Sequence, residues 1–183
     1  MGNKYFCWEK ELSHEICQKL INLGQGNWNH AAVVNKSVVG ARKSDIVWIK
    51  EQWVYDLISP YMFIANEEAG WKYNILGAQD CQVTRYTKDG FYGWHIDGMG
   101  SHNDLQRIDS ECEGLTRKLS MSVVLNSDYE GGDLEMRDLE SKIPRLEEGS
   151  IIVFPSFLEH RVTPVTEGIR YSLVTWFIGP PYV

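Results

Sequence analysis

The sequence has 183 residues, of which 43% are hydrophobic and 12% aromatic, and its formal net charge is −7 at pH 7. This length and composition suit one folded domain with its own core and exclude a disordered chain. The acidic charge disfavours a surface that binds nucleic-acid phosphates, so we expect no nucleic-acid partner. Neither an apolar leader nor a run of 18 apolar residues is present, and we expect a cytoplasmic protein without membrane contact. Its four cysteines form no C-x-x-C pair, which argues against a zinc cluster.

The N-terminal part, residues 1–79, mixes helix and strand signals. Ser13 can cap a helix that runs to Leu23, with Gly24 as its stop signal. A short apolar run at 46–49 predicts a strand, and apolar residues at helical spacing predict a second helix over 51–68. We expect this part to supply supporting helices and outer strands.

From residue 80 to residue 183, short strand-like runs follow one another, separated by turns that contain glycine. The predicted strands are 81–86, 92–97, 119–125, 133–137, 150–154, 159–163 and 169–178. Such a series is typical of a β-sandwich or jelly roll. The polar segment 98–116 interrupts the series, and we predict a mobile loop there that could act as a lid.

His95, Asp97 and His160 form the candidate metal site. His95 and Asp97 lie two residues apart in a run that resembles a strand, so we expect their side chains on one face. His160 lies in another predicted strand. Two imidazoles and one carboxylate that leave coordination positions open are typical of non-haem Fe(II) oxygenases. An H-x-D pair alone also fits a surface histidine beside a turn aspartate, so the context must decide.

Arg170 supplies part of that context. In the predicted strand 169–178, Arg170, Ser172, Val174 and Trp176 share one face, which we expect to point inward. A guanidinium on the inner face of an apolar strand requires an anion. That anion could be a protein carboxylate, or the strand could face outward. The functional alternative is the distal carboxylate of 2-oxoglutarate, held in a bidentate pair.

Several segments together resemble the prolyl 4-hydroxylase-like branch of the Fe(II)/2-oxoglutarate dioxygenases, and especially its PKHD-type hydroxylases. The matching segments, in the family's order, are 86–97, 119–126, 130–134, 148–156, 159–165 and 168–172, with a looser match at 42–49. The resemblance implies an α+β, mainly β fold: a double-stranded β-helix, which is a distorted, cupin-like jelly roll. N-terminal helices would support one sheet, residues 80–183 would form the core, and 1–183 would be a single domain.

The resemblance also implies roles for individual residues. The iron ligands, and with them the catalytic centre, would be His95, Asp97 and His160. The residues around 2-oxoglutarate would be Arg170, Tyr86, Ser120 and Ser172. The substrate contacts would be Arg117, Trp176 and Tyr92. Taken alone, Tyr86 and Trp176 are equally compatible with a place in the core.

The implied reaction converts 2-oxoglutarate and O₂ into succinate and CO₂ and hydroxylates a substrate C–H bond. The expected cofactors are Fe(II), 2-oxoglutarate as co-substrate and O₂, with ascorbate as a further candidate. The predicted substrate is a prolyl or similar residue in a protein or peptide. A free amino acid, another small molecule, or a metal-binding jelly roll without turnover are the alternatives, because Leu134 and Val124 depart from the prolyl hydroxylase pattern.

Overall fold

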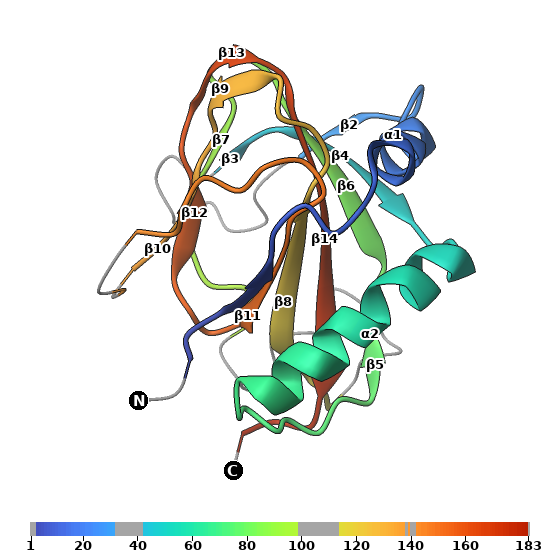
Figure 1. Cartoon of the computed structure of the whole chain (residues 1–183), viewed down its shortest axis with the longest axis vertical. Helices are drawn as coiled ribbons and strands as arrows, with labels where there is room; N and C mark the ends of the chain where they lie inside the picture. The colour runs from blue at the N-terminus through green and yellow to red at the C-terminus, as the bar shows by residue number, and fades with distance from the viewer. Residues whose placement is uncertain (1–2, 32–41, 99–113, 138, 140–141, 183) are drawn as a thin grey trace.

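The computed structural model describes residues 3–31, 42–98, 114–137, 139 and 142–182 (Figure 1). Their elements, in chain order, are β1 (Phe6–Trp8), α1 (His14–Leu23), β2 (Asn29–His30), β3 (Arg42–Lys43), β4 (Asp45–Ile49), α2 (Gln52–Glu68), β5 (Gly77–Ala78), β6 (Cys81–Tyr86), β7 (Phe91–His95), β8 (Thr116–Val124), β9 (Tyr129–Gly131), β10 (Leu134–Met136), β11 (Ile151–Pro155), β12 (His160–Val162), β13 (Val165–Gly168) and β14 (Arg170–Gly179). The predicted mainly β fold is confirmed.

Two antiparallel sheets build the jelly roll. The major sheet has the order β1-β11-β8-β14-β6-β4-β2, and β5 pairs with β14. The minor sheet has the order β10-β12-β7-β3, and β13 pairs with β9 beyond it at the top of Figure 1. Neighbours in each sheet come from distant parts of the chain. The strands that carry His95 and His160, for example, pair directly.

The major sheet has one apolar and one polar face. On β8, Leu119, Met121 and Val123 are buried in the core that α1 and α2 cover. Ser120 and Ser122 alternate with them and therefore face the interior of the jelly roll. Burial of each large apolar side chain stabilises the fold by about 1.5–3 kcal/mol. The helices thus cover one face of the major sheet, and the other face lines the interior of the jelly roll.

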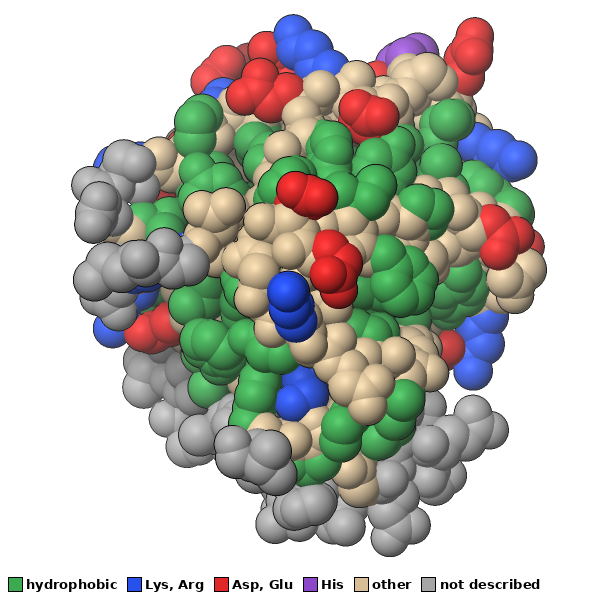
Figure 2. Space-filling view, turned by 60° about the horizontal axis from the view of Figure 1, so that its bottom comes forward, with side chains coloured by type: hydrophobic (Ala, Val, Ile, Leu, Met, Phe, Trp, Pro, Cys, Tyr) green, Lys and Arg blue, Asp and Glu red, His purple; other side chains and the backbone are tan. Residues whose placement is uncertain are grey.

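Both predicted helices are confirmed, with boundaries close to those expected. The Ser13 hydroxyl accepts a hydrogen bond from the backbone N–H of Ile16 at the start of α1, as a helix cap does. α2 runs without interruption through Pro60. No helix in the described ranges is long and apolar enough to cross a membrane. Figure 2 views the end of the molecule near α2 and both termini, where hydrophobic side chains lie between charged ones.

The predicted strand boundaries are correct or nearly so, with two differences. The strand predicted at 92–97 begins at Phe91 and ends at His95, so Asp97 lies beyond it. The strands β1, β2, β3, β5, β9 and β13, which have two to four residues each, were not predicted. Of the predicted loop at 98–116, residues 99–113 lie outside the described part of the chain, and β8 already begins at Thr116.

Candidate active site

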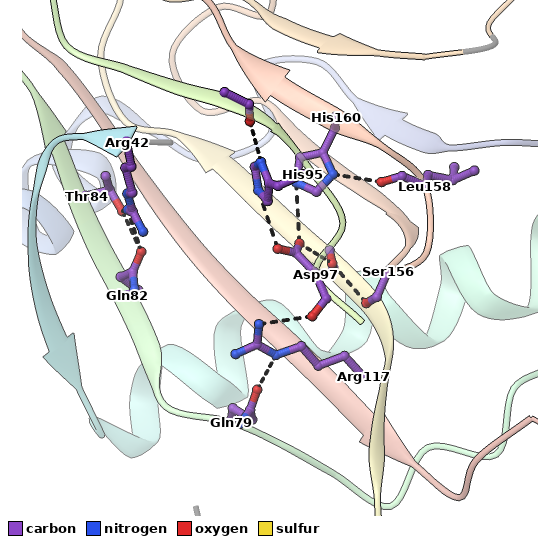
Figure 3. Close-up of polar contacts among 12 residues, drawn as sticks. Arg42, Gln79, Gln82, Thr84, His95, Asp97, Arg117, Ser156, Leu158 and His160 are labelled. Atoms are coloured by element: carbon purple, nitrogen blue, oxygen red, sulfur yellow. Dashed lines mark hydrogen bonds and ion pairs between the residues drawn. The ribbon is translucent and has the colours of Figure 1, made fainter. Parts of the chain in front are cut away.

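His95, Asp97 and His160 lie together in the interior of the jelly roll (Figure 3). One potential ligand atom from each lies within 4.8 Å of the others. The Nε2 atom of His95 is 3.6 Å from Oδ1 of Asp97, and Nε2 of His160 is 3.4 Å from Oδ2. The two histidines face each other across the pairing of β7 with β12, with ring centroids 4.2 Å apart. The structure therefore places all three side chains around one point.

Asp97 reaches this point by a different route from the one expected. Since β7 ends at His95, strand alternation does not align the two side chains, and that argument was wrong. Instead, the backbone N–H groups of Asp97 and Gly98 both donate to the carbonyl of Ser156, at 3.0 and 3.1 Å. The residue after β11 thus fixes the bend that turns the carboxylate toward the histidines.

The hydrogen bonds of the two imidazoles define their tautomers. Nδ1 of His95 is 2.7 Å from the carbonyl oxygen of Gly93, and Nδ1 of His160 is 2.8 Å from that of Leu158. A carbonyl oxygen can only accept, so each Nδ1 carries the proton and each Nε2 keeps its lone pair. Metal-bound histidines are oriented by such bonds. Two imidazole nitrogens and a carboxylate that converge on one point fit Fe(II).

The pKa values of His95 and Asp97 are both lowered, which favours the binding of a cation. Burial, reinforced by His160, lowers the pKa of His95 to about 4, so the imidazole is neutral near pH 7. Burial acts to raise the pKa of Asp97, but His160, His95 and Arg117 outweigh it and lower the pKa to about 2. Near pH 7, His95 therefore presents a lone pair and Asp97 a negative charge, and neither must first lose a proton.

Further polar contacts fix Asp97. The Ser120 hydroxyl donates to its Oδ2 at 2.7 Å and lies 2.9 Å from the Ser156 hydroxyl. Arg117 donates through Nη1 to the Asp97 carbonyl at 3.3 Å and through Nε to Oε1 of Gln79 at 2.5 Å (Figure 3). Ser120 was expected beside 2-oxoglutarate, but in the structure its hydroxyl contacts the carboxylate of Asp97. Gln79 and Ser156 were missed because each lies just outside a strand, where no periodic pattern identifies an inward side chain.

Arg170 lies on the inner face of β14, deeper in the same interior, and is only 2% exposed. Its Nη1 donates to the Ser172 hydroxyl at 3.1 Å, and its guanidinium carbon lies 5.4 Å from the ring centroid of Tyr86. Within the described residues its Nε is buried without a hydrogen-bond partner. A buried, charged donor without an acceptor is costly, and an anionic ligand would satisfy it. The predicted co-substrate residues Arg170, Tyr86 and Ser172 therefore lie together, in surroundings that suit a carboxylate.

Gly132, in the turn after β9, borders the Arg170 side chain. Its φ of +63° is a left-handed conformation that glycine adopts readily. A Cβ atom there would lie 2.8 Å from Cδ of Arg170 and 3.0 Å from Cγ2 of Val165. Because only a residue without a side chain fits, this turn can press directly on the arginine and help to fix its position.

The predicted substrate residues occupy two places. The Arg117 guanidinium stacks on Trp176, 3.8 Å from its ring centroid, and Trp48 lies 6.0 Å from Trp176. Trp48 is 46% exposed and was not predicted. Tyr92 instead lies flat against His95, with centroids 3.5 Å apart and an interplanar angle of 11°. Burial raises the pKa of Tyr92 to about 12, so its hydroxyl stays protonated.

Two imidazoles and a carboxylate that meet inside antiparallel sheets define a jelly roll with a candidate metal site. Residues 81–178, more than half of the chain, match the model of the 2OG-Fe(II) oxygenase superfamily, and the chain belongs to this superfamily. It is similar to PKHD-type hydroxylases of Alteromonas mediterranea (38% identical over 96 residues) and Idiomarina loihiensis (34% over 97 residues). These matches cover 50% and 51% of the chain, but only 40% and 39% of the relatives. The predicted resemblance is confirmed.

Solved structures show the same fold over nearly the whole chain. A viral collagen prolyl hydroxylase from Paramecium Bursaria Chlorella virus-1, in complex with 2OG, has a TM-score of 0.72 at 23% identity, covering 97% of both chains. A Pseudomonas putida prolyl-4-hydroxylase has a TM-score of 0.69 at 21% identity, covering 95% of this chain and 91% of the other. The predicted double-stranded β-helix is therefore confirmed.

Proposed function

We propose that the chain is an Fe(II)- and 2-oxoglutarate-dependent dioxygenase that hydroxylates a C–H bond. The observation that carries this proposal is the meeting of His95, Asp97 and His160, with ligand atoms within 4.8 Å of one another. Each histidine directs an Nε2 lone pair toward the same carboxylate. Such a set binds one face of a metal and leaves the other positions for co-substrate and O₂.

The proposed roles follow from the positions of the side chains. His95, Asp97 and His160 would hold Fe(II), which together with 2-oxoglutarate and O₂ supplies the oxidation of the C–H bond and the release of succinate and CO₂. Arg170 would hold the distal carboxylate of 2-oxoglutarate through its unpartnered Nε, with Tyr86 beside it. Ascorbate is proposed as a reductant that maintains the iron in the ferrous state.

The remaining residues act by orientation. Ser120 and the backbone bend at Ser156 hold the Asp97 carboxylate in place. Ser172 holds the Arg170 guanidinium through its hydroxyl. These contacts would keep the three metal ligands and Arg170 at a fixed separation. A fixed separation lowers the entropic cost of bringing the reactants together.

The proposed substrate is a prolyl or similar residue in a protein or peptide. This is supported by the names of the structural neighbours, which include a prolyl hydroxylase from Trichoplax adhaerens in complex with a fragment of the hypoxia inducible factor oxygen degradation domain. The predicted substrate residues Arg117 and Trp176 also lie beside the triad, where Arg117 contacts the Asp97 carbonyl and stacks on Trp176.

The test measures succinate from 2-oxoglutarate with Fe(II), and searches proline-containing peptides and free amino acids for products heavier by one oxygen atom. We expect His160→Ala to abolish both signals, and Arg170→Ala to raise the KM for 2-oxoglutarate at least about tenfold. His14→Ala is the matched control, because His14 is an exposed histidine remote from the site. Turnover that survived in His160→Ala, or no oxygenated product from any candidate, would contradict the proposal.

A further inference from the structure

Apart from Arg117, which contacts Gln79 and the Asp97 carbonyl, the arginines of the described chain fall into two groups. Those on the outside contact carboxylates, in the pairs Arg85–Asp45, Arg137–Glu159, Arg145–Asp133 and Arg161–Glu135. Arg42 and Arg170 contact no carboxylate within the described residues, although the chain is acidic overall. Arg170 is already explained by the proposed co-substrate. Arg42 remains as a cation whose charge the described residues leave unbalanced.

Among the described residues, the hydrogen-bond partners of Arg42 are all neutral, and two of them are labelled in Figure 3. Its Nε donates to the Ser44 hydroxyl at 2.6 Å, and its Nη2 donates to Oε1 of Gln82 at 2.8 Å and to the Thr84 hydroxyl at 3.4 Å. The guanidinium also stacks on Tyr92, 4.7 Å from the ring centroid. These contacts fix the orientation of the fork while leaving its positive charge available.

The position of Arg42 relates it to the triad. The ring of Tyr92 stacks on His95 and also carries the Arg42 guanidinium. Arg42 therefore lies on the His95 side of the triad (Figure 3). Its Nη1 forms no hydrogen bond with the described residues, and Arg42 is only partly buried. A pre-oriented, accessible donor of this kind can bind an incoming anion with little further ordering.

We propose that Arg42 binds a carboxylate of the substrate, and so selects an acidic substrate: a peptide with a Glu or Asp beside the hydroxylated residue, or a free amino acid through its own carboxylate. The proposal rests on the proposed function, because it takes the interior beside the triad as the substrate site. Charge-assisted bonds from a fixed guanidinium are worth about a tenfold to hundredfold preference. The net negative charge of the chain would otherwise repel such a substrate, so the preference must be local.

The experiment uses matched probes that differ in one charge. These are proline-containing peptides with Glu or Gln at each position flanking the proline, together with L-proline and L-prolinamide. Calorimetry measures their binding to the full chain loaded with Co(II) in place of Fe(II), so that no turnover occurs. We expect the acidic member of at least one pair to bind about tenfold more tightly or better. Arg42→Gln should abolish this difference, and Arg42→Lys should keep part of it.

Lys43→Gln is the matched control. It removes the same charge from the neighbouring position of β3, where the exposed lysine donates a hydrogen bond to the Lys88 carbonyl. It should keep the full preference. Three results would overturn the assignment. The acidic and neutral probes of every pair could bind equally to the parent chain, or the preference could persist in Arg42→Gln. Arg42→Gln could also weaken the binding of the acidic and the neutral probe by the same factor. Failure of the proposed function is a separate result: acidic probes that bind through Arg42 but yield no oxygenated product with Fe(II) and 2-oxoglutarate.

Discussion

Replacing Gly132 by alanine tests how closely the turn after β9 is fitted to Arg170. Two costs are expected. The first is conformational: an alanine at φ near +63° occupies the left-handed region, at a cost of about 1 kcal/mol. The second is steric, because the added methyl would lie 2.8 Å from Cδ of Arg170 and 3.0 Å from Cγ2 of Val165. Overpacking of this kind costs about 1–3 kcal/mol.

The two costs can be separated with a second glycine. Gly70, just after α2, has a φ of +72° and no atom within 4 Å of an added Cβ. Gly70→Ala should therefore lower the free energy of unfolding by about 1 kcal/mol, and Gly132→Ala by about 2–4 kcal/mol. For a chain of this size, each kcal/mol corresponds to a shift of about 2–4 °C in Tm.

Thermal unfolding and the KM for 2-oxoglutarate are the two measurements. Because the methyl displaces the Arg170 side chain, Gly132→Ala should also raise this KM about tenfold, which corresponds to about 1.4 kcal/mol. Gly70→Ala should leave the KM unchanged. If the two variants lost equal stability and Gly132→Ala kept the KM of the parent chain, the turn would not position Arg170, and the reasoning would be wrong.

Two further predictions concern polar contacts. Ser120→Ala removes the hydrogen bond to Asp97 and should weaken metal binding about tenfold to a hundredfold in a Co(II) titration, whereas Ser122→Ala on the same face should not. Asp45 is partly buried, which acts to raise its pKa, but its bonds with Arg85 and a nearby imidazole outweigh burial and lower it. Its stabilisation is therefore present above about pH 4 and lost as the pH falls through the lowered pKa. Asp45→Asn should cost about 1 kcal/mol in urea unfolding at pH 6 and nothing in strong acid; a cost independent of pH would contradict this assignment.

The longest strand was the most predictable from sequence. β14 has ten residues, so its alternation is unambiguous, and it correctly placed Arg170, Ser172 and Trp176 on the inner face. The two-residue strands β2, β3 and β5 are too short to show an alternation and were not predicted. Their positions depend on pairing partners far away in the chain, and sequence patterns do not report such partners.

The site shows the same limit. His95, Asp97 and His160 were identified by residue type and spacing, but the bend that turns Asp97 inward depends on a carbonyl of Ser156, and no local pattern encodes it. Arg42 drew no prediction of its own, because a basic pair on a short strand resembles an ordinary solvated surface. Its neutral surroundings become visible only when β3 and β6 are placed side by side.

The imidazoles of His95 in β7 and His160 in β12 are oriented by the same kind of hydrogen bond. In each, Nδ1 bonds to the carbonyl oxygen of the residue two positions earlier, which is Gly93 in one case and Leu158 in the other. Every amino acid carries that oxygen, so no exchange of the side chain at either position deletes the bond. The orientation of the two imidazoles therefore does not depend on which side chains stand at positions 93 and 158.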